Sequence, residues 1–321
     1  MSMYEAIKNF SEQFSYQPEI QNSKKLSSYN WYVVAGMGGS HLAADILKMY
    51  NPSLPITIHE SYGLPWPAEM LKGSLVILSS YSGNTEEVID AYQKAKEGGL
   101  ALAVISVGGK LIEMAKEDQI PYIQLPSTGI QPRSALGFSL KALMALMDQK
   151  DGLSQMNLLS DMISTDLEEK GKKLAKDINK LVPMIYSSGA NYPIAYNWKI
   201  KFNETGKIPA FCNAFPELNH NEMTGFDFNK KTKTMTENFC FIMLKDNADH
   251  PKIIKRMDVT SKLFQDRGLK VVVVELEGKD VLHKIFSSLL LADFAAYYTA
   301  QMNGAESEQV PMVEEFKKLI S

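Results

Sequence analysis

The chain has 321 residues, of which 45% are hydrophobic and 22% charged, a composition typical of one large globular domain or two smaller ones. Its net charge of −3 and the lack of a basic block argue against a nucleic-acid partner. No apolar run approaches the length of a membrane span, and the charged N-terminus lacks the apolar core of a signal peptide. We therefore expect a cytoplasmic protein with no membrane partner.

Strands and helices are predicted to alternate through the first half of the chain. The apolar runs expected to form strands cover residues 31–35, 56–60, 75–80, 101–106 and 122–125. Helical patterns follow them at residues 39–49, 85–97, 111–117 and 133–147. Unbroken apolar runs of this length are typical of parallel strands that are covered by helices on both faces.

A second alternating region follows a polar stretch, residues 151–160, that we interpret as a linker. An amphipathic helix is expected over residues 161–180. Strands are then predicted at 184–187, 239–244 and 271–276, and helices at 196–204, 250–264, 281–302 and 313–320. The sequence thus predicts an α/β protein with two doubly wound units, residues 1–150 and 151–321, each with a parallel sheet flanked by helices.

The sequence GMGGS, residues 36–40, lies between the first predicted strand and its helix. It matches neither the G-x-G-x-x-G pattern of dinucleotide sites nor the G-x-x-x-x-G-K-[ST] pattern of P-loops. The first amides of a helix lack intrahelical partners and carry partial positive charge, so such a turn can bind an anion. The alternative is a tight strand-to-helix turn without a ligand.

A second polar loop, SSYSGNT at residues 79–85, follows the apolar strand 75–80. Ligands of open parallel sheets bind beyond the carboxyl ends of the strands, and hydroxyl groups with free amides suit the oxygens of a phosphate. The alternative is that Thr85 is only the N-cap of the next helix. Taken together, the two loops favour a phosphate site formed by Gly38, Gly39, Ser40, Ser80, Ser82 and Thr85.

Cysteine and histidine usage gives no sign of a metal centre. Cys212 and Cys240 lie among apolar or aromatic neighbours, as expected of buried thiols in a reducing compartment. The five histidines lack the spacing of known zinc motifs. We therefore expect neither a metal nor another cofactor.

GMGGS followed about forty residues later by SYSGNT resembles the sugar isomerase (SIS) phosphosugar-binding domain. Four later segments, QPRSALGFSL (131–140), NWKIKFNETGKIPAF (197–211), ELNHNEM (217–223) and VPMVEEFKKLI (310–320), are similar to the bifunctional phosphoglucose/phosphomannose isomerase family. This resemblance covers nearly the whole chain. It implies two SIS-like units, a homodimer, and metal-independent interconversion of aldose and ketose 6-phosphates through an enediolate.

The resemblance also implies roles for a carboxylate and a histidine. Moving a proton between C1 and C2 of an open-chain sugar phosphate needs a base beside both carbons, and Glu204 matches the catalytic glutamate of the family. Opening the sugar ring calls for a group that exchanges protons near neutral pH. His220 matches the family's ring-opening histidine, which comes from the neighbouring subunit of the dimer. The alternatives are a solvated helix-end glutamate and a structural histidine.

Two cations complete the set that the resemblance implies. Arg133 matches the active-site arginine, which would stabilise the negative charge of the enediolate; the alternative is a surface arginine. Lys317, or the adjacent Lys318, matches the lysine of the terminal helix that assists ring opening, with a solvated helix face as the alternative. The family usually has Thr-Pro shortly before this lysine, and Val310 replaces that threonine. Since the threonine is tied to acceptance of both C2 epimers, acceptance of mannose 6-phosphate beside glucose 6-phosphate stays open.

Two other functions are compatible with the loops. One is a non-catalytic phosphosugar-binding SIS protein such as a regulator, and the other is an isomerase of another sugar phosphate, for example an amino sugar. A pure sensor would not need Glu204 and His220, and we find no effector segment or glutamine-transfer domain in the sequence. The sequence therefore favours an isomerase of hexose 6-phosphates.

Overall fold

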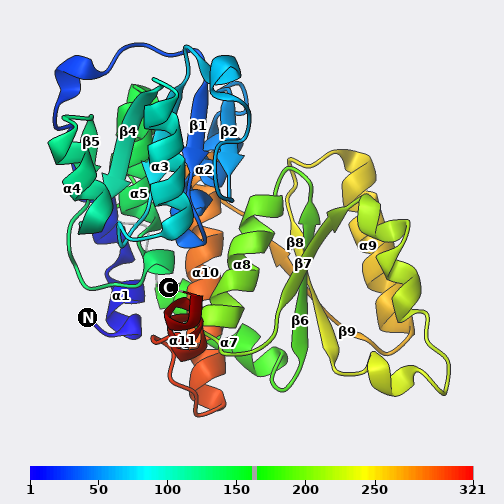
Figure 1. Cartoon of the computed structure of the whole chain (residues 1–321). Helices are drawn as coiled ribbons and strands as arrows, with labels where there is room; N and C mark the ends of the chain where they lie inside the picture. The colour runs from blue at the N-terminus through cyan, green and yellow to red at the C-terminus, as the bar shows by residue number, and fades with distance from the viewer. Residues whose placement is uncertain (161–164, 321) are drawn as a thin grey trace. The chain divides into compact units, whose positions relative to one another are not determined.

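The computed structural model describes residues 1–160 and 165–320 and shows two compact units (Figure 1). Unit 1 comprises Lys8–Met162 with Met1, and unit 2 comprises Ser2–Ile7 and Ile163–Ser321. The expected boundary lay at residue 150. In the structure, the chain passes to the second unit only after one further helix.

Unit 1 is built on a parallel sheet with the strand order β2-β1-β3-β4-β5. The strands are β1 (Tyr32–Ala35), β2 (Ile56–His59), β3 (Leu75–Ser79), β4 (Ala101–Ser106) and β5 (Tyr122–Gln124). The helices are α2 (Gly39–Tyr50), α3 (Glu86–Glu97), α4 (Gly109–Glu117), α5 (Leu136–Leu146) and α6 (Lys150–Asn157), with the 3-10 turns η1 (Phe10–Ser15), η2 (Ser23–Lys25), η3 (Ala68–Leu71) and η4 (Pro132–Ser134).

Helices cover both faces of this sheet, as the unbroken apolar runs predicted (Figure 1). Every residue of β1 and β3 is buried. On one face, side chains of these strands pack in one core cluster with Val88, Tyr92 and Leu111 of α3 and α4. Helices α2 and α5 pack against each other and contact the other face. The doubly wound architecture expected for this unit is therefore confirmed.

The expected linker at residues 151–160 is wrong, because residues 151–157 belong to helix α6. The helix buries Gly152 and Met156 within unit 1. The Nζ atom of the buried Lys141 donates to Asn157 Oδ1 at 2.6 Å. The segment was not predicted as a helix because most of its residues are polar. Its few buried positions are enough to hold the helix against unit 1. The predicted helix at 133–147 also differs, since it opens with η4 and becomes α-helical only at Leu136.

Unit 2 is a second parallel sheet, with the strand order β7-β6-β8-β9. Its strands are β6 (Val182–Ser188), β7 (Phe211–Phe215), β8 (Phe239–Lys245) and β9 (Lys270–Glu275). Its helices are α1 (Met3–Lys8), α7 (Thr165–Asp177), α8 (Tyr192–Glu204), α9 (Pro251–Asp266), α10 (Val281–Met302) and α11 (Pro311–Ile320), with the 3-10 turns η5 (Glu217–Asn219), η6 (Glu222–Phe226) and η7 (Lys233–Met235). Residues 161–164 of the helix predicted at 161–180 lie outside the described residues.

One strand and one α-helix of unit 2 were not predicted. Strand β7 is an edge strand with only Phe215 buried, so its sequence lacks a continuous apolar run. Helix α1 is short, but Tyr4 donates its hydroxyl to Glu168 of α7 at 3.0 Å. Tyr298 of α10 donates to the same carboxylate oxygen at 2.7 Å. The first helix of the chain is thereby held in the second unit.

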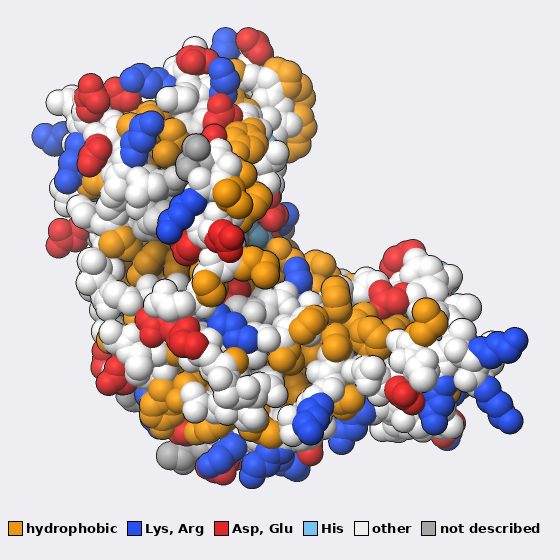
Figure 2. Space-filling view, turned by 60° about the horizontal axis from the view of Figure 1, so that its bottom comes forward, with side chains coloured by type: hydrophobic (Ala, Val, Ile, Leu, Met, Phe, Trp, Pro, Cys, Tyr) orange, Lys and Arg blue, Asp and Glu red, His pale blue; other side chains and the backbone are white. Residues whose placement is uncertain are grey.

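The molecular surface carries charges of both signs. Figure 2 shows acidic and basic side chains interspersed over one face, in keeping with a net charge of −3. Among residues 1–160 and 165–320, no helix is both long and apolar enough to cross a membrane.

Candidate functional site

Unit 1 brings the ends of three segments into backbone contact at the carboxyl edge of its sheet. A Cβ on Gly36 would lie 3.0 Å from the Ser79 carbonyl oxygen, at the end of β3. A Cβ on Gly39 would lie 3.0 Å from the Pro132 carbonyl carbon and 3.1 Å from the Arg133 nitrogen. Since real Cβ atoms rarely approach so closely, GMGGS needs these glycines for packing.

The predicted hydroxyl groups form a connected set in these loops. Ser40 Oγ accepts a hydrogen bond from the Tyr81 amide at 3.0 Å, which joins the first loop to the second. Ser80 is buried, and its Oγ lies 2.8 Å from Thr85 Oγ1 and accepts from the Gly83 amide at 3.1 Å. Thr85 makes no side-chain cap bond to α3, so its hydroxyl is not used as a simple N-cap.

The remaining residues predicted for this site lie in the same two loops. Ser82 is exposed, and its Oγ accepts from the Asn84 amide at 3.3 Å. Gly38 has φ +53°, a conformation that favours glycine, and directly precedes α2. The second loop is also packed tightly, because a Cβ on Gly83 would lie 1.8 Å from the Gly108 carbonyl oxygen of the loop after β4.

This edge of the sheet has the geometry of an anion site. Strands β1 and β3 are parallel neighbours, and the chain leaves them toward opposite sides of the sheet. Ligands of doubly wound folds bind at such a switch point. Helix α2 begins shortly after β1, and α3 begins after the loop that follows β3, so the amino ends of both helices lie at this edge with partial positive charge.

Arg133 lies in η4 beside the first loop and is only 3% exposed. The alternative of a surface arginine is therefore wrong. The close approach of Gly39 to its backbone fixes Arg133 next to the first turn of α2. A cation at this place complements the negative charge that the crevice is suited to bind.

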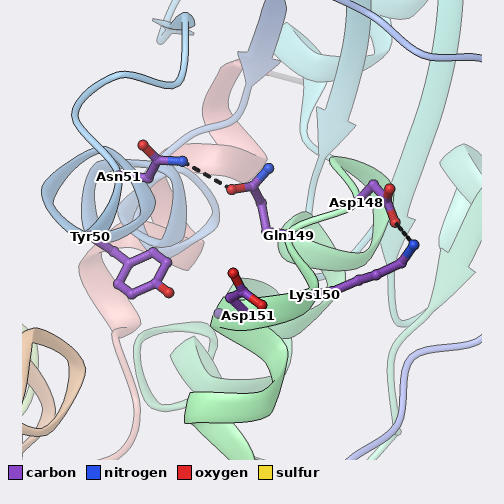
Figure 3. Close-up of a pocket in the computed structure, with 7 residues that line it drawn as sticks. Tyr50, Asn51, Asp148, Gln149, Lys150 and Asp151 are labelled. Atoms are coloured by element: carbon purple, nitrogen blue, oxygen red, sulfur yellow. Dashed lines mark hydrogen bonds and ion pairs between the residues drawn. The ribbon is translucent and has the colours of Figure 1, made fainter.

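A cavity of about 510 Å³ in unit 1 lies elsewhere (Figure 3). It is lined by Tyr50, Asn51, Asp148, Gln149, Lys150, Asp151 and Gly152. Tyr50 is the last residue of α2, so the helix length of about 18 Å separates the cavity from the polar loops. Two aspartates against one lysine, which pairs with Asp148 at 3.3 Å, make it a poor site for an anion.

Glu204 is the last residue of α8 in unit 2 and is half-buried. The helix ends there because Gly206 folds back on it, where a Cβ would lie 2.7 Å from the Phe202 carbonyl oxygen. Lys207 has φ +56° and donates its Nζ to the Glu204 carbonyl at 2.7 Å and to the Gln309 carbonyl, just before α11. The N-E-T-G-K motif is thus a helix end that holds the glutamate in place.

His220 is exposed and lies between η5 and η6. Nearby, the Glu222 carboxylate accepts hydrogen bonds from the Tyr186 hydroxyl and, at 2.5 Å, from Asn213 Nδ2. Burial and the adjacent carboxylate raise the pKa of Tyr186, which keeps it a hydrogen-bond donor. The sequence predicted a role for His220 but not for Tyr186, which lies 36 residues from Glu222 in β6 and carries no local signal.

Within one chain, unit 2 does not bring Glu204 and His220 together. Strands β6 and β7 are parallel, so α8 returns from the carboxyl end of β6 to the amino end of β7. Glu204 therefore lies at the amino edge of the sheet and His220 at the carboxyl edge. A five-residue strand spans about 17 Å between those edges.

Lys317 lies on α11, a helix with no buried residue, and forms a 2.8 Å ion pair with Glu314. Within this chain, its contact with Glu314 is the one expected of a solvated helix face.

Cys240 is buried as predicted, whereas Cys212 is only partly buried, and burial raises the pKa of both thiols. Among the described residues, His, Cys, Asp and Glu side chains nowhere gather in threes suited to a metal ion.

Two doubly wound parallel sheets, one of them with a hydroxyl-rich switch point, define an α/β protein of the SIS-domain class. The C-terminal domain of glucosamine-fructose-6-phosphate aminotransferase from Francisella tularensis has a similar fold, with a TM-score of 0.70 and 14% identity over 96% of each chain. Residues 167–320 match the family of the bacterial phospho-glucose isomerase C-terminal SIS domain.

Relatives with similarity over the full length identify the family. The chain is 34% identical over 345 residues to a bifunctional phosphoglucose/phosphomannose isomerase from Caldicellulosiruptor bescii, covering 99% of both proteins. It is 31% identical over 323 residues to the protein of the same name from Aquifex aeolicus, covering 98% of this chain and 97% of the relative. The chain belongs to the bifunctional phosphoglucose/phosphomannose isomerase family, as its motifs predicted.

Proposed function

We propose that this chain is an aldose–ketose isomerase that interconverts glucose 6-phosphate and fructose 6-phosphate without a metal ion. Besides family membership, one observation on the structure supports the proposal. The Ser40, Ser80 and Thr85 hydroxyls lie in connected loops at a switch point, beside the buried Arg133. These groups suit a phosphate and the charged sugar attached to it.

The proposed reaction begins with phosphate binding to Ser40, Ser80, Ser82, Thr85 and the first amides of α2 and α3. Binding the remote phosphate would hold C1 and C2 in position for proton transfer. His220 would move the protons that open the sugar ring, and Lys317 would hold the ring oxygen. Glu204 would then take the proton from C2 of the aldose and return it to C1. Arg133 would stabilise the enediolate formed in between.

We further propose that the working enzyme is a homodimer in which His220 of one chain serves Glu204 of the other. The exposure of His220 supports this arrangement. So does the sheet topology, which keeps the two residues at opposite edges within one chain. A cytoplasmic location is compatible with the two free cysteines.

The first experiment is a coupled assay with the purified chain after treatment with EDTA. Fructose 6-phosphate is supplied, and formation of glucose 6-phosphate and mannose 6-phosphate is followed separately. We expect turnover to survive EDTA and to collapse in Glu204→Gln. Glu113→Gln, which changes an exposed carboxylate of α4 outside the proposed machinery, is the matched control and should keep its activity.

The two product rates also test the effect of Val310. If the missing threonine hydroxyl matters, the glucose epimer will form much faster than the mannose epimer. If there is no turnover but a hexose phosphate still raises the melting temperature of the chain, the chain is a phosphosugar-binding protein and not an isomerase. Turnover confined to an amino-sugar phosphate would replace it with a related isomerase.

A further inference from the structure

The segment that carries His220 is anchored on both sides of an exposed side chain. Before it, Asn219 donates from Nδ2 to Thr260 Oγ1 of α9 at 2.9 Å, and its Oδ1 accepts from Arg256 at 3.3 Å. After it, the Glu222 carboxylate is bound to the sheet. His220 is thus held by its neighbours rather than by its own side chain.

The anchor at Glu222 is the stronger of the two, because it reaches two strands at once. One carboxylate oxygen accepts from Tyr186, a fully buried residue of β6. The other accepts from Asn213 of β7 at 2.5 Å. In addition, Asn221 Oδ1 accepts from the Glu222 amide at 2.5 Å and Asn221 Nδ2 donates to Glu217 at 2.8 Å, which fixes the two residues after His220.

We propose that Glu222 is a positioning residue for ring opening, which acts by fixing the backbone of His220 at the carboxyl edge of the second sheet. This inference rests on the proposed function. A proton-transfer group must lie within hydrogen-bond reach of the ring oxygen, and a displacement of about 1 Å can cost about a hundredfold in rate. An exposed histidine in the turn between two 3-10 helices gains that precision from the anchors on either side of it.

A carboxylate is suited to this place because it is an acceptor on both oxygens. Tyr186 and Asn213 both donate, so an ionised Glu222 satisfies each of them. In Glu222→Gln, one of the two oxygens becomes an NH₂ group, which can meet the Tyr186 hydroxyl only as a donor, and both anchoring bonds lose the charge of the carboxylate. The substitution keeps the shape of the side chain but weakens the anchor.

The experiment separates ring opening from the later steps. Exchange between the anomers of fructose 6-phosphate, measured by NMR, reports ring opening alone. Binding of a linear five-carbon sugar-phosphate hydroxamate, which mimics the enediolate and has no ring to open, reports the rest of the site. Glu222→Gln and Tyr186→Phe are compared with wild type, and Asp227→Asn is the control, since Asp227 pairs with Arg267 in the same region.

We expect Glu222→Gln and Tyr186→Phe each to lower anomer exchange and the kcat of isomerisation in parallel by about 10–100-fold. The Kd of the hydroxamate should stay within twofold, and Asp227→Asn should behave as wild type. Tyr186→Phe breaks the same contact from the buried side, so it keeps the test decisive if Glu222→Gln does not fold.

Two results would overturn this inference and leave the proposed function standing. One is anomer exchange at the wild-type rate in both folded variants. The other is an equal loss of hydroxamate binding and kcat, which would indicate general damage to the site. A folded wild-type protein without isomerase activity would instead overturn the proposed function, and this inference with it.

Discussion

At the scale of single residues, the hydroxyl group of Ser80 joins two other residues of the second polar loop. It contacts Thr85 and accepts from the Gly83 amide, so it shapes the loop and also lies in the proposed phosphate site. A hydrogen bond to a charged group contributes about 1.5–3 kcal/mol. We therefore expect Ser80→Ala to lower kcat/KM for fructose 6-phosphate by about 10–100-fold in steady-state assays.

The matched control for this change is Ser154→Ala, which removes an exposed hydroxyl bound to the Lys150 carbonyl of α6. It should leave kcat/KM unchanged. Equal values for Ser80→Ala and wild type would mean that the hydroxyl is only part of the loop structure and that the phosphate lies elsewhere.

Gly38 and Gly39 separate two effects of adding a side chain, a steric clash with neighbouring backbone and a strained φ angle. A Cβ on Gly39 would press on the Pro132–Arg133 backbone, whereas a Cβ on Gly38 would meet nothing within 4 Å but would require φ +53°. We expect Gly39→Ala to displace Arg133 and to reduce kcat by at least tenfold. Gly38→Ala should instead lower stability by about 1 kcal/mol. Steady-state kinetics and chemical denaturation of both variants separate the two effects, and a Gly39→Ala enzyme with normal kcat would contradict the packing argument.

At the scale of elements, α8 is fixed by a buried ion pair. Lys201 Nζ lies 2.6 Å from Asp293 Oδ1 of α10, and both side chains are at most 4% exposed. Lys201→Met takes the ion-pair partner at 2.6 Å away from the buried Asp293 carboxylate, so it should lower the free energy of unfolding by about 3–5 kcal/mol. The double variant Lys201→Met/Asp293→Leu should recover most of that loss in urea denaturation. Additive losses in the double variant would show that packing, and not charge, dominates at this place.

The helices and strands also show which parts of the fold could be predicted from the sequence. Strands with continuous apolar runs, such as β4 and the fully buried β3, were predicted nearly to the residue because burial on both faces leaves a strong pattern. The exposed edge strand β7 and the mostly polar helix α6 were missed, because tertiary contacts rather than local patterns hold them. The same distinction applies to the candidate site. Motifs predicted the hydroxyl loops, whereas the contact between Glu222 and Tyr186 joins residues that no local pattern connects.

At the scale of the whole molecule, the sheet topology makes a prediction about assembly. Glu204 and His220 lie at opposite edges of one sheet, so the proposed reaction needs a second copy of the chain. In a two-fold dimer each chain gives and receives the same contact. Chains with Glu204→Gln keep His220, and chains with His220→Ala keep Glu204. One intact site can therefore form in each mixed dimer.

Subunit exchange between equal amounts of the two inactive variants should restore about a quarter of the wild-type activity, since half of the dimers are mixed and each has one working site of two. Exchange is verified by native mass spectrometry, and Asp227→Asn chains mixed with wild type serve as the control. If both residues of a site came from one chain, every mixed dimer would contain two damaged sites and no activity would return. The amount of recovered activity thus distinguishes a shared site from one built within a single chain.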